Sequence, residues 1–221
     1  MIEALRDPRM RPVITACITL SLAVGVFGAS FGVGAVTAGA SVAQSCVISL
    51  LVFTGASQFS AVSVIGGGGS TASALGGALL LAARNGVYGL AMARRLDGTL
   101  GRRLVAAQLT IDESTAMSAA QSDPDAQRLA FWITGVSLYV FWNLGTLLGA
   151  WAGTAIDPKT FGLDAAFPAA YVAMVWPLLG DRRCRLAAVC GGSICVALIP
   201  FVPVGVPILC AAAAVLVGVR R

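Results

Sequence analysis

The first part of this chain contains no charged residue over a very long stretch. Between positions 12 and 83 there is no Asp, Glu, Lys or Arg. The helices and strands of a soluble domain need a polar face toward water, so this stretch excludes an ordinary soluble fold. A membrane-spanning helix needs roughly 20 apolar residues, which leaves room here for about three spans and their turns. We therefore predict an integral membrane protein.

Histidine is absent from the whole sequence. Its absence removes the commonest metal ligand and the usual general base, and so excludes His-ligated metalloenzymes and Ser-His intramembrane proteases. The six cysteines mostly fall inside apolar runs and form no CxxC pair, so we interpret them as small apolar residues in helix packing. No nucleophile has a base beside it. We predict no enzyme activity, no metal and no cofactor.

The overall composition is apolar and weakly basic. Hydrophobic residues make up 57% of the 221 residues and charged residues 11%, and the mean hydropathy is +0.86. This length suits one membrane domain, residues 1–221, with little soluble mass. A net charge of +5 would suggest nucleic acid in a soluble protein. Here the basic residues lie between apolar runs, as membrane orientation requires, so the predicted partner is the lipid bilayer and not nucleic acid.

The apolar runs predict an all-α polytopic membrane fold with about seven transmembrane segments, each ending at charges, Gly/Ser clusters or prolines. The first run is too long for a cleaved signal, so we expect it to stay in the protein. Residues 94–128 form a predicted polar loop, with an apolar patch at 104–120 that is too short to cross. The predicted segments are residues 12–38, 41–65, 71–93, 129–152, 164–180, 186–200 and 204–219.

The arginines give conflicting signals about orientation. Clusters occur at residues 94–103, 182–185 and 220–221. They share one side if segments four to seven each cross once, and we predict that this side is the cytoplasm. Three further crossings then place the arginines of residues 6–11 outside, although their charge favours the inside. Either the crossings are real, which we favour, or the first segment is a re-entrant hairpin, which its glycines permit.

Glycine-rich runs also leave open an internal repeat. Residues 32–39 and 145–153 are each followed by a shorter helix with a breaker, Gly55 in one and Pro177 in the other. An odd number of spans in each unit would make two inverted repeats with broken helices, as in many secondary transporters. The alternative is that these glycines only allow helices to pack closely.

Small polar residues interrupt the middle of the second segment, within the block 53–59. Open backbone at membrane depth is tolerated only where it lines a cavity or is buried in protein. The start of a half-helix there offers N–H groups and positive potential to a carboxylate. The alternative is a close helix contact through Gly and Ser, but a buried glutamine needs partners. The candidate substrate-binding residues of this block are Phe53, Thr54, Gly55, Ser57 and Gln58.

Arg84 lies well inside the third segment and is followed by Asn85. It precedes Arg94 by roughly 15 Å of helix, so reaching the interface by snorkelling is strained. Burying an arginine in a span is costly, and such residues usually face a cavity or a partner. We predict that Arg84 is paired or binds substrate, with Asn85 beside it.

The candidate counter-charges for this arginine are Asp112 and Glu113. An acid pair held partly out of water has one raised pKa and can exchange protons during transport. The alternative is that both are solvated loop charges. Asn143 in the fourth segment is a further candidate substrate-binding residue, or else a hydrogen-bonding group between helices.

This sequence contains three blocks, at residues 27–39, 53–59 and 79–90, that resemble the AzlC family, the larger subunit of bacterial branched-chain amino-acid exporters. Support also comes from residues 109–113 (LTIDE), and from 162–164 leading to 167–169. The resemblance covers about residues 12–185, and the block FTGASQF is its most specific part. The three blocks that carry the resemblance are FGASFGVGAVTAG at 27–39, FTGASQF at 53–59 and LLLAARNGVYGL at 79–90.

The resemblance implies a multi-pass protein of the bacterial inner membrane that exports valine and similar small hydrophobic amino acids. It also implies a small, separately encoded membrane subunit of the AzlD type. Family members commonly have Arg-His where this chain has Arg84-Asn85, which argues against an imidazole proton relay here. The family pattern LTDE is interrupted by Ile111 in this chain.

These observations combine into one hypothesis and one rival. In the hypothesis, the break at residues 55–58 and Arg84 contact the substrate carboxylate, and Phe53 or Phe59 contacts its branched side chain. Asp112 or Glu113 couples export to protons. The rival is a non-transporting membrane scaffold, in which the Gly/Ser motifs only pack helices and dock a partner.

Overall fold

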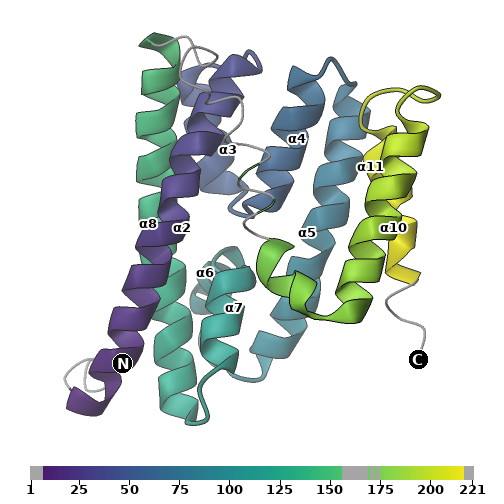
Figure 1. Ribbon diagram of the computed structural model, residues 1–221. Helices are drawn as coiled ribbons and strands as arrows, with labels where there is room; N and C mark the ends of the chain where they lie inside the picture. Colours follow the sequence, from purple (N-terminus) through teal and green to yellow (C-terminus); the bar gives the residue numbers. More distant parts are fainter. Residues whose placement is uncertain (1–6, 156–168, 170–171, 173–174, 217–221) are drawn as a thin grey trace.

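The computed structural model describes residues 7–155, 169, 172 and 175–216, and all regular structure within them is helical (Figure 1). The all-α prediction is confirmed. Most of the predicted segment 164–180 lies outside the described residues. The elements are η1 (Pro8–Met10), α2 (Arg11–Thr37), α3 (Val42–Leu51), α4 (Ala56–Gly66), α5 (Thr71–Ala93), α6 (Leu100–Gln108), α7 (Asp112–Ala119), α8 (Pro124–Ala155), η3 (Trp176–Gly180), α10 (Arg182–Leu198), α11 (Val206–Ala211) and η4 (Ala212–Ala214).

Two described stretches, Pro8–Thr37 and Pro124–Thr154, are helical, long and apolar enough to cross a membrane. They contain α2 and α8, which pack side by side and run parallel. Residue numbers increase in the same direction along both helices: Cys17 lies beside Ala130, and Gly32 lies beside Thr146. A Cβ atom at Gly32 would overlap the backbone of α8. The glycines here allow close packing, and parallel α2 and α8 do not fit the inverted repeat that began with these two segments.

The second predicted segment, 41–65, does not cross the membrane. It divides into α3 and α4 at residues 52–55, where Gly55 has φ +56°, a left-handed conformation that favours glycine. The end of α4 returns to the end of α2, since a Cβ at Gly66 would lie 3.3 Å from Ala38. The two short helices therefore form a re-entrant hairpin (Figure 1). Our preference for true crossings was wrong, and the hairpin lies in the second segment instead of the first.

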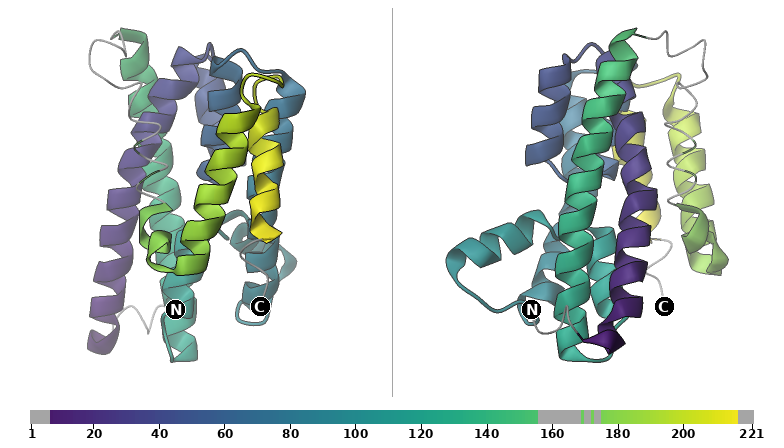
Figure 2. Two further views of the ribbon diagram at one scale, coloured as in Figure 1. Left: turned by 45° about the vertical axis from the view of Figure 1, so that its right-hand side comes forward. Right: turned by 90° about the vertical axis from the view of Figure 1, so that its left-hand side faces the viewer.

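The third predicted segment, 71–93, coincides with the helix α5, which follows the glycine turn at 66–70 and runs antiparallel to α4. The predicted polar loop 94–128 is only partly a loop. It contains α6 and α7, and α8 begins at Pro124, five residues before the predicted start at 129. Figure 2 shows that α6 projects sideways from the bundle, while α7 lies against α8.

The bounds of the later helices differ from the predicted segments. α10 covers Arg182–Leu198 where we predicted 186–200, and α11 covers only Val206–Ala211 of the segment 204–219. The two helices lie side by side (Figure 2), and α11 touches α5, because Leu209 lies 3.4 Å from the Cβ position of Gly76.

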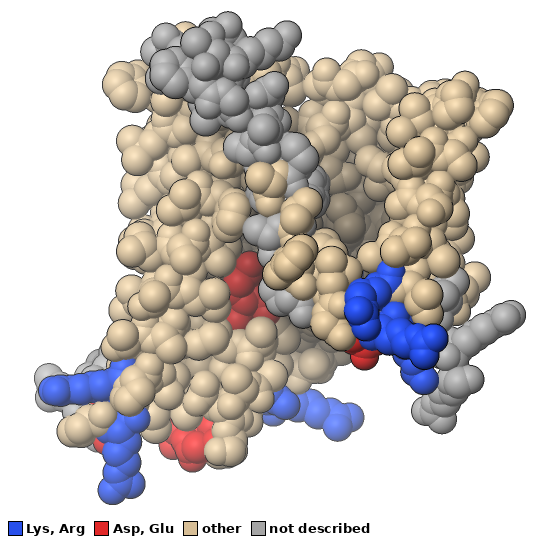
Figure 3. Space-filling view, in the orientation of Figure 1, with Lys and Arg blue, Asp and Glu red and all other residues tan. Residues whose placement is uncertain are grey.

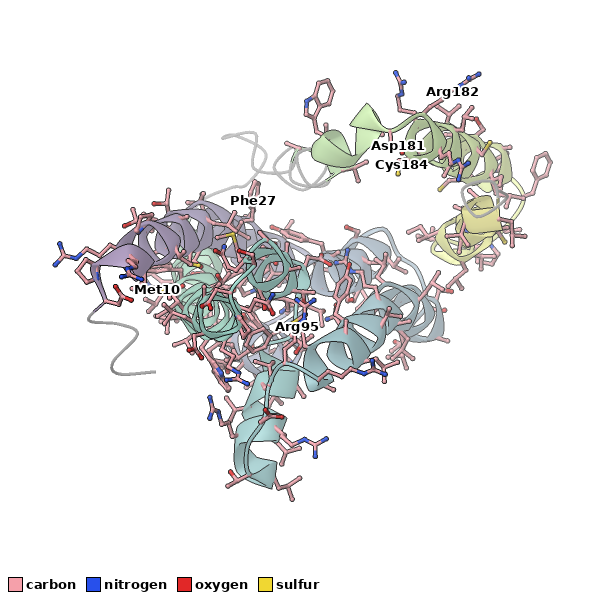
Figure 4. All side chains as sticks on the ribbon, turned by 90° about the horizontal axis from the view of Figure 1, so that it is seen from below. Met10, Phe27, Arg95, Asp181, Arg182 and Cys184 are labelled. Carbon is pink, nitrogen blue, oxygen red and sulfur yellow. The ribbon has the colours of Figure 1, made fainter. Side chains whose placement is uncertain are left out.

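Charge is distributed unequally between the two ends of the bundle. Figure 3 shows arginine side chains gathered at the lower end, the arginine-rich end. Seen from that end, Figure 4 labels Met10, Arg95 and Arg182, which belong to three separate parts of the bundle. The described connections at the opposite end of the bundle are residues 38–41, 67–70 and 199–205, and these residues carry no charge. Because the hairpin does not cross, Arg9 and Arg11 share an end with the described arginines of residues 94–103 and 182–185, and the orientation conflict disappears for these groups.

The described core is aromatic and aliphatic, and its centre includes Phe31, Phe59, Phe131 and Trp142. Large apolar side chains also cover the outside: Leu90 on α5, for example, is 77% exposed. A single surface residue of this kind is ordinary, but apolar outer faces on most helices are what a lipid-embedded bundle requires.

Candidate substrate site

The break between α3 and α4 gathers buried polar atoms that lack partners. The Gln58 side chain folds back and accepts a hydrogen bond from the backbone N–H of Gly55 at 3.2 Å. Its Nε2 has no partner among the described residues, and the same holds for Ser57 Oγ and Thr54 Oγ1. Ser57 and Gln58 are only 1% and 2% exposed. Leaving such groups unpaired costs about 1–3 kcal/mol each, so the cluster is a place where a polar ligand would find partners.

The two phenylalanines of the block lie in the core instead of on an open wall. The Phe59 ring meets Phe31 and Trp142 edge to face, with centroids 6.0 Å away in both cases. Phe53 meets Tyr139 in the same way at 5.0 Å. Their packing holds the break in place from both sides. Direct contact between either phenylalanine and a substrate stays a prediction.

Arg84 forms the ion pair that we predicted with one of its candidate counter-charges. Arg84 Nη2 lies 2.8 Å from Asp112 Oδ2, and the two side chains are 34% and 30% exposed. The contact is single: Arg84 Nε and Asp112 Oδ1 are buried and have no partner among the described residues. Asn85 follows Arg84 directly, and Tyr88 lies one turn further along α5. Both side chains are half-buried.

Glu113 follows Asp112 in α7, which is too short to span a membrane. Burial raises the pKa of Glu113 above its ordinary value, and the negative charge of Asp112 adds to this while Arg84 opposes it. A carboxyl group with a raised pKa binds a proton more readily, as exchange of a proton during transport requires. The structure thus places both predicted acids beside Arg84.

The break and the ion pair lie at similar depth in the bundle. A Cβ at Gly77 would lie 3.1 Å from Ser60 Oγ, which fixes the register of α5 against α4. The helices run antiparallel, so Gly55 lies about 7 Å and Arg84 about 10 Å from that contact, both toward the arginine-rich end. The structure therefore brings the two predicted halves of the site to one level.

Asn143 is the predicted residue with the weakest structural support. Its Nδ2 donates to Tyr139 O at 2.8 Å within its own helix, so the interhelical bond that we considered is not made by this atom. Its Oδ1 is buried and has no partner among the described residues. Asn143 follows Trp142, whose ring lies 3.7 Å from the Cβ position of Gly55.

Sequence reasoning missed the residues that hold the end of α3. The carbonyl oxygen of Leu50 accepts hydrogen bonds from Gln108 Nε2 and from the Tyr139 hydroxyl, each at 3.0 Å. Gln108 also reaches Leu51 O at 3.3 Å. These bonds tie the hairpin to α6 and α8. The only local signal was a glutamine within the apolar patch 104–120, which does not identify its partner.

An apolar cavity of about 520 Å³ opens within the hairpin, on the side opposite the arginine-rich end. It lies between α2, α3 and α4, and the break separates it from the arginine-rich end. Its walls are small and aliphatic and include Ala35, Ala38, Val47, Ile48, Val62 and Ile65. Such a lining suits an apolar side chain and offers little to a charged one.

Taken together, a lipid-compatible surface, a re-entrant hairpin and an ion pair at membrane depth are features of a transport-related membrane protein. The AzlC protein family matches residues 19–156, more than half of the chain, and this protein belongs to that family.

Curated relatives are distant but cover most of the chain. The "Branched-chain amino acid transport protein AzlC" of Bacillus subtilis is 25% identical over 75% of this chain and 63% of its own length. An uncharacterized membrane protein of Helicobacter pylori (strain ATCC 700392 / 26695) is 26% identical over 71% of this chain and 70% of its own. Another uncharacterized membrane protein, from Haemophilus influenzae, is 24% identical over 75% of this chain and 66% of its own length. The chain thus spans less than two thirds of the Bacillus protein. No solved structure matches significantly.

Proposed function

We propose that this protein exports branched-chain amino acids such as valine across the bacterial inner membrane, coupled to protons. The name of the Bacillus subtilis relative supports the substrate class. The observation that carries the proposal is the Arg84–Asp112 ion pair, with a contact of 2.8 Å, at the depth of the hairpin break. Ionisable residues at such depth are costly and are commonly kept for a polar cargo.

The substrate carboxylate binds between Arg84 and the start of α4. A guanidinium is well suited to a carboxylate, and the start of α4 adds positive potential. The unpartnered hydroxyl groups of Thr54 and Ser57 supply further hydrogen bonds. The branched side chain faces apolar surroundings, which Phe53 and Phe59 provide, and Asn85 and Asn143 line the route.

Protons couple to export through the acids of α7. Glu113, with its raised pKa, carries the proton, and Asp112 is the other candidate carrier. The arginine-rich end faces the cytoplasm, as the distribution of positive charge favours. A small AzlD-type subunit is a proposed partner, and copurification from cells that express both genes tests for it.

The experiment measures valine efflux from cells loaded with a valine-containing dipeptide. Arg84→Ala removes the side chain that binds the substrate carboxylate. We therefore expect efflux at least about tenfold slower, as loss of a charge-assisted hydrogen bond predicts. Arg103→Ala, an exposed arginine of α6, is the matched control and should leave efflux unchanged. Normal efflux from a well-expressed Arg84→Ala protein would remove this residue from the site.

The rival scaffold function explains the glycines between α2 and α8, which are needed for packing alone. It gives no reason for unpartnered buried polar atoms at Thr54, Ser57 and Gln58. We therefore favour transport.

A further inference from the structure

We propose that the Arg84–Asp112 ion pair recognises both charges of a zwitterionic amino acid: it opens so that Arg84 takes the carboxylate and Asp112 takes the ammonium group. This inference rests on the proposed amino-acid transport and adds which side chain binds each of the two charges of the cargo. It also gives the two neighbouring acids of α7 different roles.

The pair is incomplete as an ion pair. An arginine and a carboxylate commonly meet through two parallel hydrogen bonds, which use two nitrogens and both oxygens. Here only Arg84 Nη2 and Asp112 Oδ2 meet, at 2.8 Å. Arg84 Nε and Asp112 Oδ1 are buried and have no partner among the described residues. One unused donor and one unused acceptor thus remain at the same ion pair.

These unused atoms are complementary to the two charged groups of an amino acid. A carboxylate accepts hydrogen bonds from a guanidinium, and an ammonium group donates to a carboxylate. When the substrate enters, one ion pair is replaced by two, and the net charge of the site does not change. The side chains of Arg84 and Asp112 are about one-third exposed, so a small molecule can reach the pair. The unused Nε and Oδ1 atoms are buried and become accessible when the pair opens.

No other described acid pairs with Arg84. α7 also packs against α8, whose first turns carry Asp125 and Arg128. These two are engaged with each other at 3.6 Å, and Arg128 also contacts Asp97. Among the described residues, the other titratable groups beside the pair are Glu113 and the Tyr88 hydroxyl. With Asp112 holding the ammonium group, Glu113 is the acid left to carry the proton.

This arrangement predicts a sharp limit on the cargo. Valine carries both charges, N-acetylvaline lacks the ammonium group, and valinamide lacks the carboxylate. Each analogue leaves one member of the opened pair without a charged partner. We expect each to bind about tenfold to a hundredfold more weakly than valine, as loss of a hydrogen bond to a charged group predicts.

The test is competition against radiolabelled valine on membranes that contain the full-length protein. In Asp112→Asn, we expect the preference for valine over N-acetylvaline to fall below about threefold, while valinamide is still rejected. In Arg84→Gln, we expect the reverse: the preference over valinamide falls and N-acetylvaline is still rejected. Asp125→Asn and Arg103→Gln are the charge-matched controls and should keep both preferences.

The wild-type comparison alone decides the matter if a variant does not fold. If valine binds saturably but either analogue competes equally well, the zwitterion inference is wrong and the proposed function stands. Equal loss of both preferences in both variants also overturns it. If wild-type protein binds no valine, the proposed function fails, and this inference fails with it.

Discussion

The hairpin break depends on one glycine, Gly55. Replacing this residue tests the effect of backbone strain in the absence of a steric clash. Gly55 has φ +56° and ψ −89°, a backbone conformation that residues with a Cβ atom rarely adopt. Space is not the obstacle, because the nearest atom to an added Cβ is a Trp142 ring carbon at 3.7 Å. Gly55→Ala therefore introduces strain and no clash.

The expected cost follows from that conformation. A residue with a side chain in a sparsely populated region costs about 1–3 kcal/mol. For a chain of this size, each kcal/mol lowers the thermal midpoint by roughly 2–4 °C. The strain is relieved if the turn at residues 52–55 opens, which would displace the start of α4. We therefore expect Gly55→Ala to lower both the thermal midpoint and valine efflux.

A second glycine provides the control. Gly86 lies inside α5, and an added Cβ there meets nothing within 4 Å. Gly86→Ala should be neutral or slightly stabilising, since alanine favours helix over glycine. If purified Gly55→Ala matches Gly86→Ala in thermal midpoint and in efflux, the reasoning about the break is refuted.

Three further predictions concern the polar groups and the topology. Gln58→Leu removes the acceptor for one backbone N–H, so stability should change by only about 1 kcal/mol while efflux falls; unchanged efflux would favour the scaffold function. Glu113 holds its proton at a pH where an ordinary glutamate is ionised, because its pKa is raised. Wild-type efflux should therefore decline as pH rises through that pKa, and Glu113→Gln should be slower and insensitive to pH over the same range; a retained pH response excludes Glu113 as the carrier. On a cysteine-free background, Ala40→Cys and Thr71→Cys should react with an impermeant thiol reagent from the same side of the membrane, and labelling from opposite sides would restore a true crossing at 41–65.

Much of the fold could be predicted because the signals were local. The absence of charge over residues 12–83 identified the membrane environment, and periodic apolar runs placed α2 and α5 to within about one residue. The break at Gly55 was also predictable, since Thr54, Gly55 and Ser57 gather glycine and small polar residues in the middle of an apolar run, where they weaken a helix. Arg84 and Asp112 were matched because few charges were available near the predicted depth.

The direction of the chain after Gly55 was not predictable in the same way. Residues 41–65 are apolar enough for a span, and hydropathy is the same whether the second half continues or turns back. The bonds from Gln108 and Tyr139 to Leu50 O join residues far apart in sequence, and no local pattern contains them.

The sequence alone therefore determined that this protein lies in a membrane, is helical and keeps an arginine at depth, because each of these depends on the transfer free energy of local residues. The tertiary structure decided that the second segment is a hairpin, that α2 and α8 run parallel, and that Arg84 meets Asp112 through a single contact. Those features depend on which distant surfaces fit together, and packing between distant segments is not encoded in any one stretch of the chain.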